Sequence, residues 1–310
     1  MSFSSEIKHE IAYNELRNCC SKAQLSALMQ LCSSLSISAS GMAISYRSEN
    51  PTVAKRALSL LKNLYGIKSE LNVYQKANLK KNNIYELKFS DNAIEILKDL
   101  SIYTDKGLAD YPRYDVVKKE CCARAYIAGC FLAYGSCNAP GKSDYHLEIV
   151  FNEESTANFV IRQIKRFNIN AKLTKRRNKN VVYIKKADEI SDFLRLIGAQ
   201  ESLMNFENTR ISRDFINSKI RLDNCDIANM QKSLQSAKAQ IAAIEKLQND
   251  GKLDKLDTRL QDVARLRLVY PEESLSELCK EYERIYRESI SRSGLKHRFD
   301  KLISLAGGEK

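Results

Sequence analysis

The sequence contains no apolar run that approaches the roughly 18 residues of a membrane-spanning helix. Its start, Met-Ser-Phe-Ser-Ser-Glu-Ile-Lys-His-Glu, also lacks the basic segment and apolar core of a secretory signal. These two absences argue against membrane proteins and secreted proteins. We therefore expect a protein that stays in the cytoplasm and makes no membrane contact.

Histidine is scarce, and cysteine lacks the spacing of a common metal site. The three histidines, His9, His146 and His297, lie far apart, and the nine cysteines include no Cys-x-x-Cys pair. This pattern argues against both a disulfide framework and a zinc site, so we expect no metal and no cofactor. Most of the cysteines are expected to be small core residues in a reducing compartment, and none is indicated as a nucleophile.

Acidic residues are fewer than basic ones. The chain has 38 Asp and Glu against 50 Lys and Arg, which gives a net charge of +12. This excess favours a polyanionic partner, but charge alone leaves DNA, RNA and an acidic membrane surface open. A length of 310 residues, with 44% hydrophobic and 28% charged residues, is typical of a soluble globular protein and suits two domains.

Residues 125–137 carry small side chains at helical spacing, and a matching stretch lies 102 residues upstream. The repeat aligns Cys19-Cys20 with Cys121-Cys122, and Ala23 with Ala125. Two halves of one fold are the simplest interpretation. Gly129 in mid-helix costs about 1 kcal/mol relative to alanine, which a closely packed backbone would offset. We therefore expect the two small helix faces to pack together about a pseudo-twofold axis.

The stretch Ile127-Ala-Gly-Cys-Phe-Leu-Ala-Tyr-Gly135 resembles the LAGLIDADG motif of homing endonucleases. In that family a helix pair forms the interface between two halves and ends in metal-binding acids. Here the acid position is Tyr134, and its counterpart in the first half is Cys32. Neither residue is a hard anionic ligand for magnesium, so we expect no catalytic residue. Together with the C-terminal stretch described below, the pattern is similar to the WhiA family of bacterial DNA-binding regulators, over almost the whole chain.

The hydrophobic periodicity predicts the order αββαββα in each half, with one four-stranded antiparallel sheet per half. The expected fold class is α+β. A saddle-shaped, degenerate LAGLIDADG-like domain is expected over residues 1–206, with repeats at about 1–103 and 115–206. A helical linker over residues 207–250 would join it to an all-α helix-turn-helix domain over residues 251–310.

Residues 162–186 hold a dense run of positive charge without any acidic residue. The centre of this run lies at the expected turn of a hairpin, where side chains could reach phosphates. Such contacts would position the protein on DNA without reading its sequence. The alternative is an ordinary solvated basic loop. The candidate residues are Lys172, Lys175, Arg176, Arg177 and Lys179.

The expected linker carries a polar stripe at the helical spacing i, i+7, i+11 and i+14, formed by Arg210, Asn217, Arg221 and Asn224. Residues 221–229 resemble an asparagine- and arginine-rich signature of the WhiA family, although Ile220 stands where we expect asparagine. The stripe is a candidate for DNA contact. Alternatively, it only caps and tethers the linker.

The final stretch predicts a recognition helix. Ser274-Leu-Ser-Glu277 forms a capping box that would start the preceding helix. Within residues 291–302, Leu295, Phe299 and Leu302 would face the core. The resemblance to the end of the WhiA family implies that the outward residues enter the major groove, whereas an ordinary surface helix is the alternative. These residues are Arg292, Ser293, Lys296, His297, Arg298 and Lys301.

The resemblance implies a non-catalytic, sequence-specific DNA-binding protein that is not an enzyme. It further implies a regulatory role in sporulation-linked transcription, or in cell division and chromosome segregation. The alternatives are an active endonuclease with relocated metal ligands, and a protein that binds RNA, DNA or a protein partner nonspecifically. We expect double-stranded DNA as the main partner, with other regulatory or division proteins as further candidates. The protein should associate with the nucleoid. A monomer is favoured.

Overall fold

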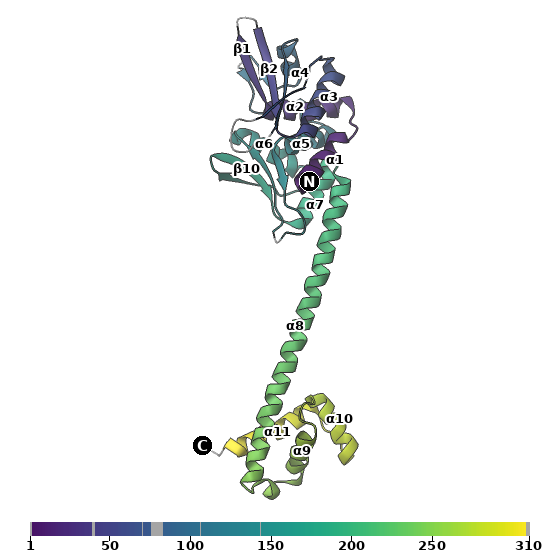
Figure 1. Cartoon of the computed structure of the whole chain (residues 1–310), viewed down its shortest axis with the longest axis vertical. Helices are drawn as coiled ribbons and strands as arrows, with labels where there is room; N and C mark the ends of the chain where they lie inside the picture. The colour runs from purple at the N-terminus through teal and green to yellow at the C-terminus, as the bar shows by residue number, and fades with distance from the viewer. Residues whose placement is uncertain are drawn as a thin grey trace. The chain divides into compact units, whose positions relative to one another are not determined.

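The computed structural model describes residues 2–38, 41–69, 71–75, 83–105, 107–142 and 144–307. The chain divides into two compact units, Met1–Arg213 and Asp214–Lys310. One long helix, α8 (Gln200–Asn249), begins in the first unit and ends in the second (Figure 1). The expected helical linker over residues 207–250 lies almost entirely within this one helix.

The first unit contains two copies of the order αββαββα, which confirms the predicted repeat. The first copy consists of α2 (Asn18–Cys32), β1 (Ser33–Ser38), β2 (Gly41–Ser48), α3 (Pro51–Tyr65), β3 (Leu71–Gln75), β4 (Asn83–Phe89) and α4 (Ala93–Asp99). The second consists of α5 (Glu120–Tyr134), β7 (Gly135–Cys137), β8 (Leu147–Phe151), α6 (Glu154–Lys165), β9 (Lys172–Arg176), β10 (Lys179–Ile184) and α7 (Ala187–Ile197).

Each copy forms one four-stranded antiparallel sheet, as expected. The strand orders are β1-β2-β4-β3 and β7-β8-β10-β9, which are equivalent under the repeat. Between the copies lie the short strands β5 (Tyr103–Thr104) and β6 (Gly107–Leu108), followed by the 3-10 helix η1 (Tyr114–Val117). The small-faced stretch 125–137 is not helical throughout, because its last three residues are extended and form β7.

Helices α2 and α5 pack against each other through their small residues, which confirms the predicted interface. A Cβ atom added to Gly129 would lie 2.7 Å from the Gln24 backbone oxygen and 2.8 Å from the Ala27 Cβ. Glycine is therefore needed here for close approach of the two helices. The Tyr126 hydroxyl donates a hydrogen bond of 2.8 Å to Gln30 Oε1 across the same pair.

The N-terminal helix α1 (Phe3–Tyr13) packs on α3 and α5, burying Phe3, Ile7 and Ile11. It also supplies an acid to the start of α8. The Glu10 carboxylate accepts hydrogen bonds from the backbone N–H groups of Glu201, at 2.7 Å, and Ser202, at 3.0 Å. These N–H groups have no partner within their own helix, so Glu10 caps α8 from a distant part of the sequence.

The second unit is all helical. It contains the end of α8, the 3-10 helix η2 (Leu253–Lys255), α9 (Thr258–Val269), α10 (Leu275–Tyr286) and α11 (Arg292–Gly307). Its apolar core includes Ile244 and Leu247 from α8, and Leu295, Phe299 and Leu302 from α11. The spacing of three to four residues between core positions along α11 leaves the opposite side of that helix for solvent.

Candidate functional site

Capping residues mark both ends of helix α10 and the start of helix α11. The Ser274 hydroxyl accepts from the Glu277 N–H, and the Glu277 carboxylate accepts from the Ser274 N–H, which confirms the capping box. Arg287 adopts a left-handed conformation at the end of α10. The Ser291 hydroxyl then accepts from the Gly294 N–H at 3.1 Å and starts α11. The result is a short turn between two helices.

Helix α11 separates its apolar and polar residues as expected. Leu295, Phe299 and Leu302 are fully buried. The exposed members of the candidate set are Arg292, Ser293, Lys296, His297 and Lys301. All but Lys301 lie in the first two turns, which is the part of a recognition helix that reaches base edges in helix-turn-helix proteins.

Arg298 does not face outward freely, contrary to our expectation. Its guanidinium donates a hydrogen bond of 3.0 Å to the Tyr282 hydroxyl and lies 5.5 Å from the centre of the Tyr282 ring. Tyr282 is buried in the core of this unit. Arg298 therefore fastens α11 to α10, because side chains at positions 295, 298, 299 and 302 of a helix lie near one face.

The basic hairpin has the expected turn. Strands β9 and β10 are joined by Arg177 and Asn178, whose φ angles of 51° and 59° are typical of a two-residue hairpin turn with left-handed residues. Residues opposite each other in antiparallel strands share a face, and successive residues alternate. Arg176 opposes Lys179, and Thr174 opposes Val181.

The alternation divides the candidate residues between two faces of the sheet. Leu173 opposes the core residue Val182, so Leu173 and Lys175 lie on the face that α6 covers. Lys175 accordingly pairs at 2.8 Å with Glu154 at the start of α6. The opposite face, here called the open face, carries Lys172, Arg176 and Lys179, with Arg177 in the adjacent turn. A shallow hollow on the open face is lined by Val150, Arg176, Arg177, Lys179 and Val181.

The open face contains its own acid, although the basic run has none in sequence. Glu148 of β8 accepts two hydrogen bonds from Arg176, and His146 Nε2 lies 3.0 Å from the same carboxylate. The first sheet shows a similar arrangement, in which Glu86 pairs with Arg47 at 2.7 Å and Lys88 at 3.2 Å. Both sheets therefore hold a carboxylate among cations.

The polar stripe of the linker does not act as one set. Arg210 lies in the first unit, where it pairs with Asp188 at 2.7 Å and Glu207 at 3.5 Å. Asn217, Arg221 and Asn224 lie on α8 within the second unit, and all three are exposed. The tethering interpretation suits Arg210, while the other three residues remain candidates for DNA contact.

Cys32 and Tyr134, here called the motif ends, occupy the positions where the LAGLIDADG motif would carry metal-binding acids, and neither is a carboxylate. Burial raises the pKa of the Cys32 thiol to about 12 and the pKa of the Tyr134 hydroxyl to about 12. Lys8 lies beside Cys32, and burial lowers the pKa of its ammonium group to about 8. Near pH 7 these three groups comprise two neutral donors and one cation. This set does not fit magnesium, which requires hard oxygen ligands of negative charge.

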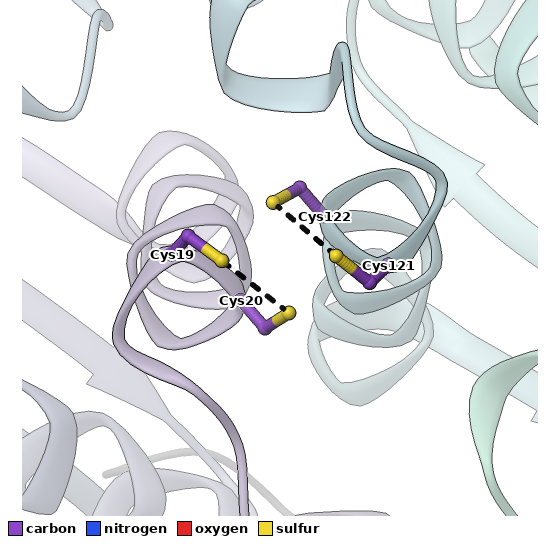
Figure 2. A group of neighbouring side chains, drawn as sticks. All are labelled: Cys19, Cys20, Cys121 and Cys122. Carbon is purple, nitrogen blue, oxygen red and sulfur yellow. Dashed lines mark hydrogen bonds between the residues drawn. The ribbon is translucent and has the colours of Figure 1, made fainter.

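Four of the nine cysteines lie together in the fold, whereas the sequence analysis treated most cysteines only as small core residues. The sulfur atoms of Cys19, Cys20, Cys121 and Cys122 all lie within 4.8 Å of one another. Figure 2 shows them between the first turns of α2 and α5. Cys20 and Cys122 are buried, whereas Cys19 is exposed. The repeat of 102 residues was the sequence signal for this meeting, because it aligns the two Cys-Cys pairs.

Sequence reasoning missed Arg267, a buried cation in the second unit. Its side chain is 2% exposed, and its Nε donates at 2.9 Å to Gln240 Oε1 of α8. It also donates at 2.7 Å to the Glu273 carbonyl oxygen and lies 5.2 Å from the Phe299 ring centre. Arg267 therefore connects α8, α9, the α9–α10 turn and α11. Helical spacing could have indicated this burial, because Arg267 follows the buried residues Leu260, Val263 and Ala264 by seven, four and three positions.

Among the described residues, no helix combines the length and apolarity needed to cross a bilayer.

The fold and the site define a class of protein: a two-repeat LAGLIDADG-like unit that lacks acids at Cys32 and Tyr134, followed by a helix-turn-helix unit. Comparison with protein families agrees. The WhiA N-terminal LAGLIDADG-like domain matches residues 18–103, the WhiA LAGLIDADG-like domain matches residues 123–216, and the WhiA C-terminal HTH domain matches residues 220–306. The chain belongs to the WhiA family.

Full-length relatives support this assignment. Proteins of Bacillus licheniformis and Macrococcus caseolyticus, each named "Probable cell division protein WhiA", are 40% identical to this chain, and the match covers 99% of it and 96% of each relative. The crystal structure of full-length WhiA from Thermatoga maritima is 25% identical, covers 100% of both chains and has a TM-score of 0.59.

Proposed function

We propose that the chain is a non-catalytic, sequence-specific DNA-binding regulator. The observation that carries this proposal is the division of α11, which buries Leu295, Phe299 and Leu302 and exposes Lys296 and His297. A helix anchored by its apolar side can present the opposite side to the major groove without losing core packing. Lysine and histidine side chains at its start can then donate to base edges.

The first unit supplies phosphate contacts in this proposal. Lys172, Arg176 and Lys179 share the open face of the second sheet, and Arg177 stands at its turn. Cations that neutralise phosphates add affinity without selecting a sequence, and they make binding depend on salt. The net charge of +12 agrees with this division between affinity and sequence reading.

We propose that the protein is non-catalytic because of the chemistry of Cys32 and Tyr134 at the motif ends. Strand cleavage by two metal ions requires ligands that hold the ions near the attacking and leaving oxygens. Cys32 and Tyr134 are protonated near neutral pH, and Lys8 adds a positive charge beside them. The same arrangement can still support a protein surface that binds DNA without cutting it.

The name of these relatives, "Probable cell division protein WhiA", connects those proteins with cell division. We extend this to the present chain and place it at the nucleoid, as a regulator in cell division and chromosome segregation or in sporulation-linked transcription. A monomer with one recognition helix suits this role.

The test is selection of binding sites from a randomised duplex pool by the full chain. A double variant, Lys296→Ala with His297→Ala, should lose enrichment while keeping salt-sensitive binding to random duplex. Each good bidentate base contact is worth roughly 1–3 kcal/mol on the preferred site. The matched control is Lys246→Ala, which removes an exposed lysine from α8 in the same unit. Equal enrichment by the double variant would contradict base reading by α11, and preference for structured RNA over duplex would contradict the DNA assignment.

A further inference from the structure

The four-cysteine cluster lies at the start of the helix pair that joins the two repeats. Cys19 and Cys20 belong to the first turn of α2, and Cys121 and Cys122 to the first turn of α5. Within each pair the sulfur atoms lie 3.9 Å and 4.0 Å apart (Figure 2). The cluster is at the opposite end of the helices from Cys32 and Tyr134, so it is separate from the degenerate motif ends.

The sulfur spacing suits one tetrahedral ion. Zinc–sulfur bonds of about 2.3 Å place the four sulfurs of a tetrahedral site about 3.8 Å apart. The two within-helix distances are already close to this value, and the widest distance of 4.8 Å needs only a small shift of the first turns. An iron–sulfur cluster would place several iron and sulfide atoms between the thiolates and would need wider spacing. A single ion is therefore the better fit.

The donor set determines the class of ion. The cluster contains four thiols and, among the described residues, neither a histidine nor a carboxylate completes it. Soft thiolate ligands select zinc and similar thiophilic ions over magnesium or calcium, and a four-sulfur tetrahedral site is typical of structural zinc.

The surroundings offset the charge of such a site. One divalent ion with four thiolates carries a net charge of −2. Both helix N-termini point their unpaired N–H groups toward this region, and neither Arg17 nor Lys119 caps its helix with a side-chain hydrogen bond. Two hollows flank the cluster, one beside Cys20 and Cys121 and the other beside Cys19 and Cys122. Cations outnumber acids in their linings, where Arg17, Lys118, Lys119 and Arg124 accompany Glu15 and Asp115, and Lys22 pairs with Asp99.

We propose that Cys19, Cys20, Cys121 and Cys122 bind one zinc ion that fastens the two repeats together at the start of the α2–α5 pair. Binding forms four zinc–sulfur bonds and releases one proton to solvent from each thiol that was still protonated, with no oxidant involved. Exposed Cys19 gives the ion a route of entry.

The experiment uses the full chain, purified under reducing and anaerobic conditions and freed of metal with a chelator. Zinc should bind with a stoichiometry of one ion per chain and should protect Cys19 and Cys121, the accessible thiols of the cluster, from alkylation. Cobalt(II) should give the visible bands of a tetrahedral site together with sulfur-to-cobalt charge-transfer absorption of four thiolates. At a hundredfold excess of free zinc over Kd, the melting temperature of the first unit should rise by roughly 5–10 °C.

Paired substitutions locate the site. The double variant Cys19→Ser with Cys122→Ser removes one ligand from each helix and should abolish the four-thiolate cobalt spectrum. The matched double variant Cys225→Ser with Cys279→Ser changes two cysteines of the second unit and should retain it. If the first double variant fails to fold, the cobalt spectrum of the unaltered chain still decides, because its charge-transfer intensity counts the thiolate ligands.

Three outcomes would overturn the proposal. One is a reduced chain in which Cys19 and Cys121 react equally fast with and without zinc. Another is a cobalt spectrum without sulfur charge transfer. The third is a reduced chain that rejects both ions and, on mild oxidation, forms disulfides between α2 and α5, seen as a mass loss of two hydrogens per bridge. The cluster would then be a redox-sensitive pair of bridges, not a zinc site.

Discussion

The Arg176 guanidinium donates to both carboxylate oxygens of Glu148, at 3.0 and 3.1 Å. Arg176 lies on β9 and Glu148 on β8, so the contact crosses the intervening strand β10 on the second sheet's open face. Glu148 is mostly buried, while Arg176 is exposed. Glu148 therefore neutralises one of the cations that we assign to phosphate contact. The acid limits how strongly this face attracts a polyanion, and it orients the guanidinium at the same time.

The first prediction is that Glu148→Gln strengthens binding to random duplex. Glutamine keeps the shape of the side chain but has no negative charge, so it no longer neutralises the positive charge of Arg176. If the open face contacts phosphates, each additional neutralised phosphate should steepen the slope of log K against log salt by about 0.9. The measurement is duplex binding over a salt series with the full chain.

Glu154→Gln is the matched control, because it makes the same charge change and releases Lys175 on the face covered by α6. It should leave the salt slope nearly unchanged. Equal effects from both variants would mean that net charge, not the open face, controls binding. No effect from either would remove the hairpin from the interface.

The second prediction separates two roles on α11. Arg298→Ala should destabilise the second unit by about 1–2 kcal/mol, because it removes a hydrogen bond to Tyr282 and a cation–π contact. Lys296→Ala should change stability by less than about 0.5 kcal/mol, since Lys296 is exposed. Hydrogen exchange of the α10 and α11 amides measures the first effect. Faster exchange in the Lys296 variant than in the Arg298 variant would reverse the assignment.

The third prediction is that the protein does not nick plasmid DNA with magnesium or manganese. The two motif ends, Cys32 and Tyr134, are neutral near pH 7, and Lys8 beside them repels a divalent ion. Glu49 is the acid whose charge acts on Tyr134, so it is the first residue to replace if nicking is seen. Metal-dependent nicking that Glu49→Gln abolishes would restore the endonuclease alternative.

The fourth prediction concerns the helix interface. Gly129→Ala should lower the free energy of unfolding of the first unit. The added methyl group would meet the Gln24 backbone oxygen at 2.7 Å, and such overpacking costs roughly 1–3 kcal/mol. Alanine recovers about 1 kcal/mol of helix propensity, so the net loss should be up to about 2 kcal/mol. Urea unfolding measures it, with Gly141→Ala as control because nothing lies within 4 Å of that added Cβ. A stabilised Gly129 variant would mean that the helices separate at little cost.

Local and periodic features were predictable from the sequence. The offset of 102 residues gave both the repeat and the α2–α5 interface, because helix faces follow directly from residue spacing. The capping box at Ser274 and Glu277 involves residues three positions apart, so tertiary context hardly alters it. The buried positions of α11 followed from the same helical spacing.

Contacts between distant segments were not predictable in this way. Lys175 and Arg176 are neighbours in sequence, yet strand alternation places them on opposite faces with different acids, Glu154 and Glu148. Nothing in the basic run indicates either partner. The meeting of Cys20 with Cys122 needs both the repeat and the packing direction of two helices. Arg298 carries charge like its neighbours, but the aromatic residue that holds it lies on another helix.

The fifth prediction is a pH dependence that Glu86 contributes to the first unit. Its carboxylate side chain is 6% exposed, and it accepts hydrogen bonds from Ser45 and Arg47. Burial alone would raise the pKa of Glu86, but hydrogen bonds from Ser45, Arg47 and Lys88 outweigh it and lower this pKa from 4.5 to about 2. A carboxyl group whose pKa is lower in the folded state stabilises that state above the unfolded pKa. This contribution is therefore present at pH 7 and is lost as the pH falls from about 5 toward 2.

Glu86→Gln isolates this contribution. The substituted glutamine would keep the size of the side chain but lose the charge. The unaltered chain should therefore be more stable at pH 7 by roughly 1–3 kcal/mol. Screening by water limits the difference to this range, since Arg47 and Lys88 are exposed. More than half of that difference should disappear by pH 3. Urea unfolding of both chains at several pH values measures it, and Glu95→Gln makes the same charge change at an exposed position of α4. A difference between the unaltered chain and the Glu86 variant that is constant from pH 7 to pH 3 would show that Glu86 is held by shape and hydrogen bonding without a preference for its charged form.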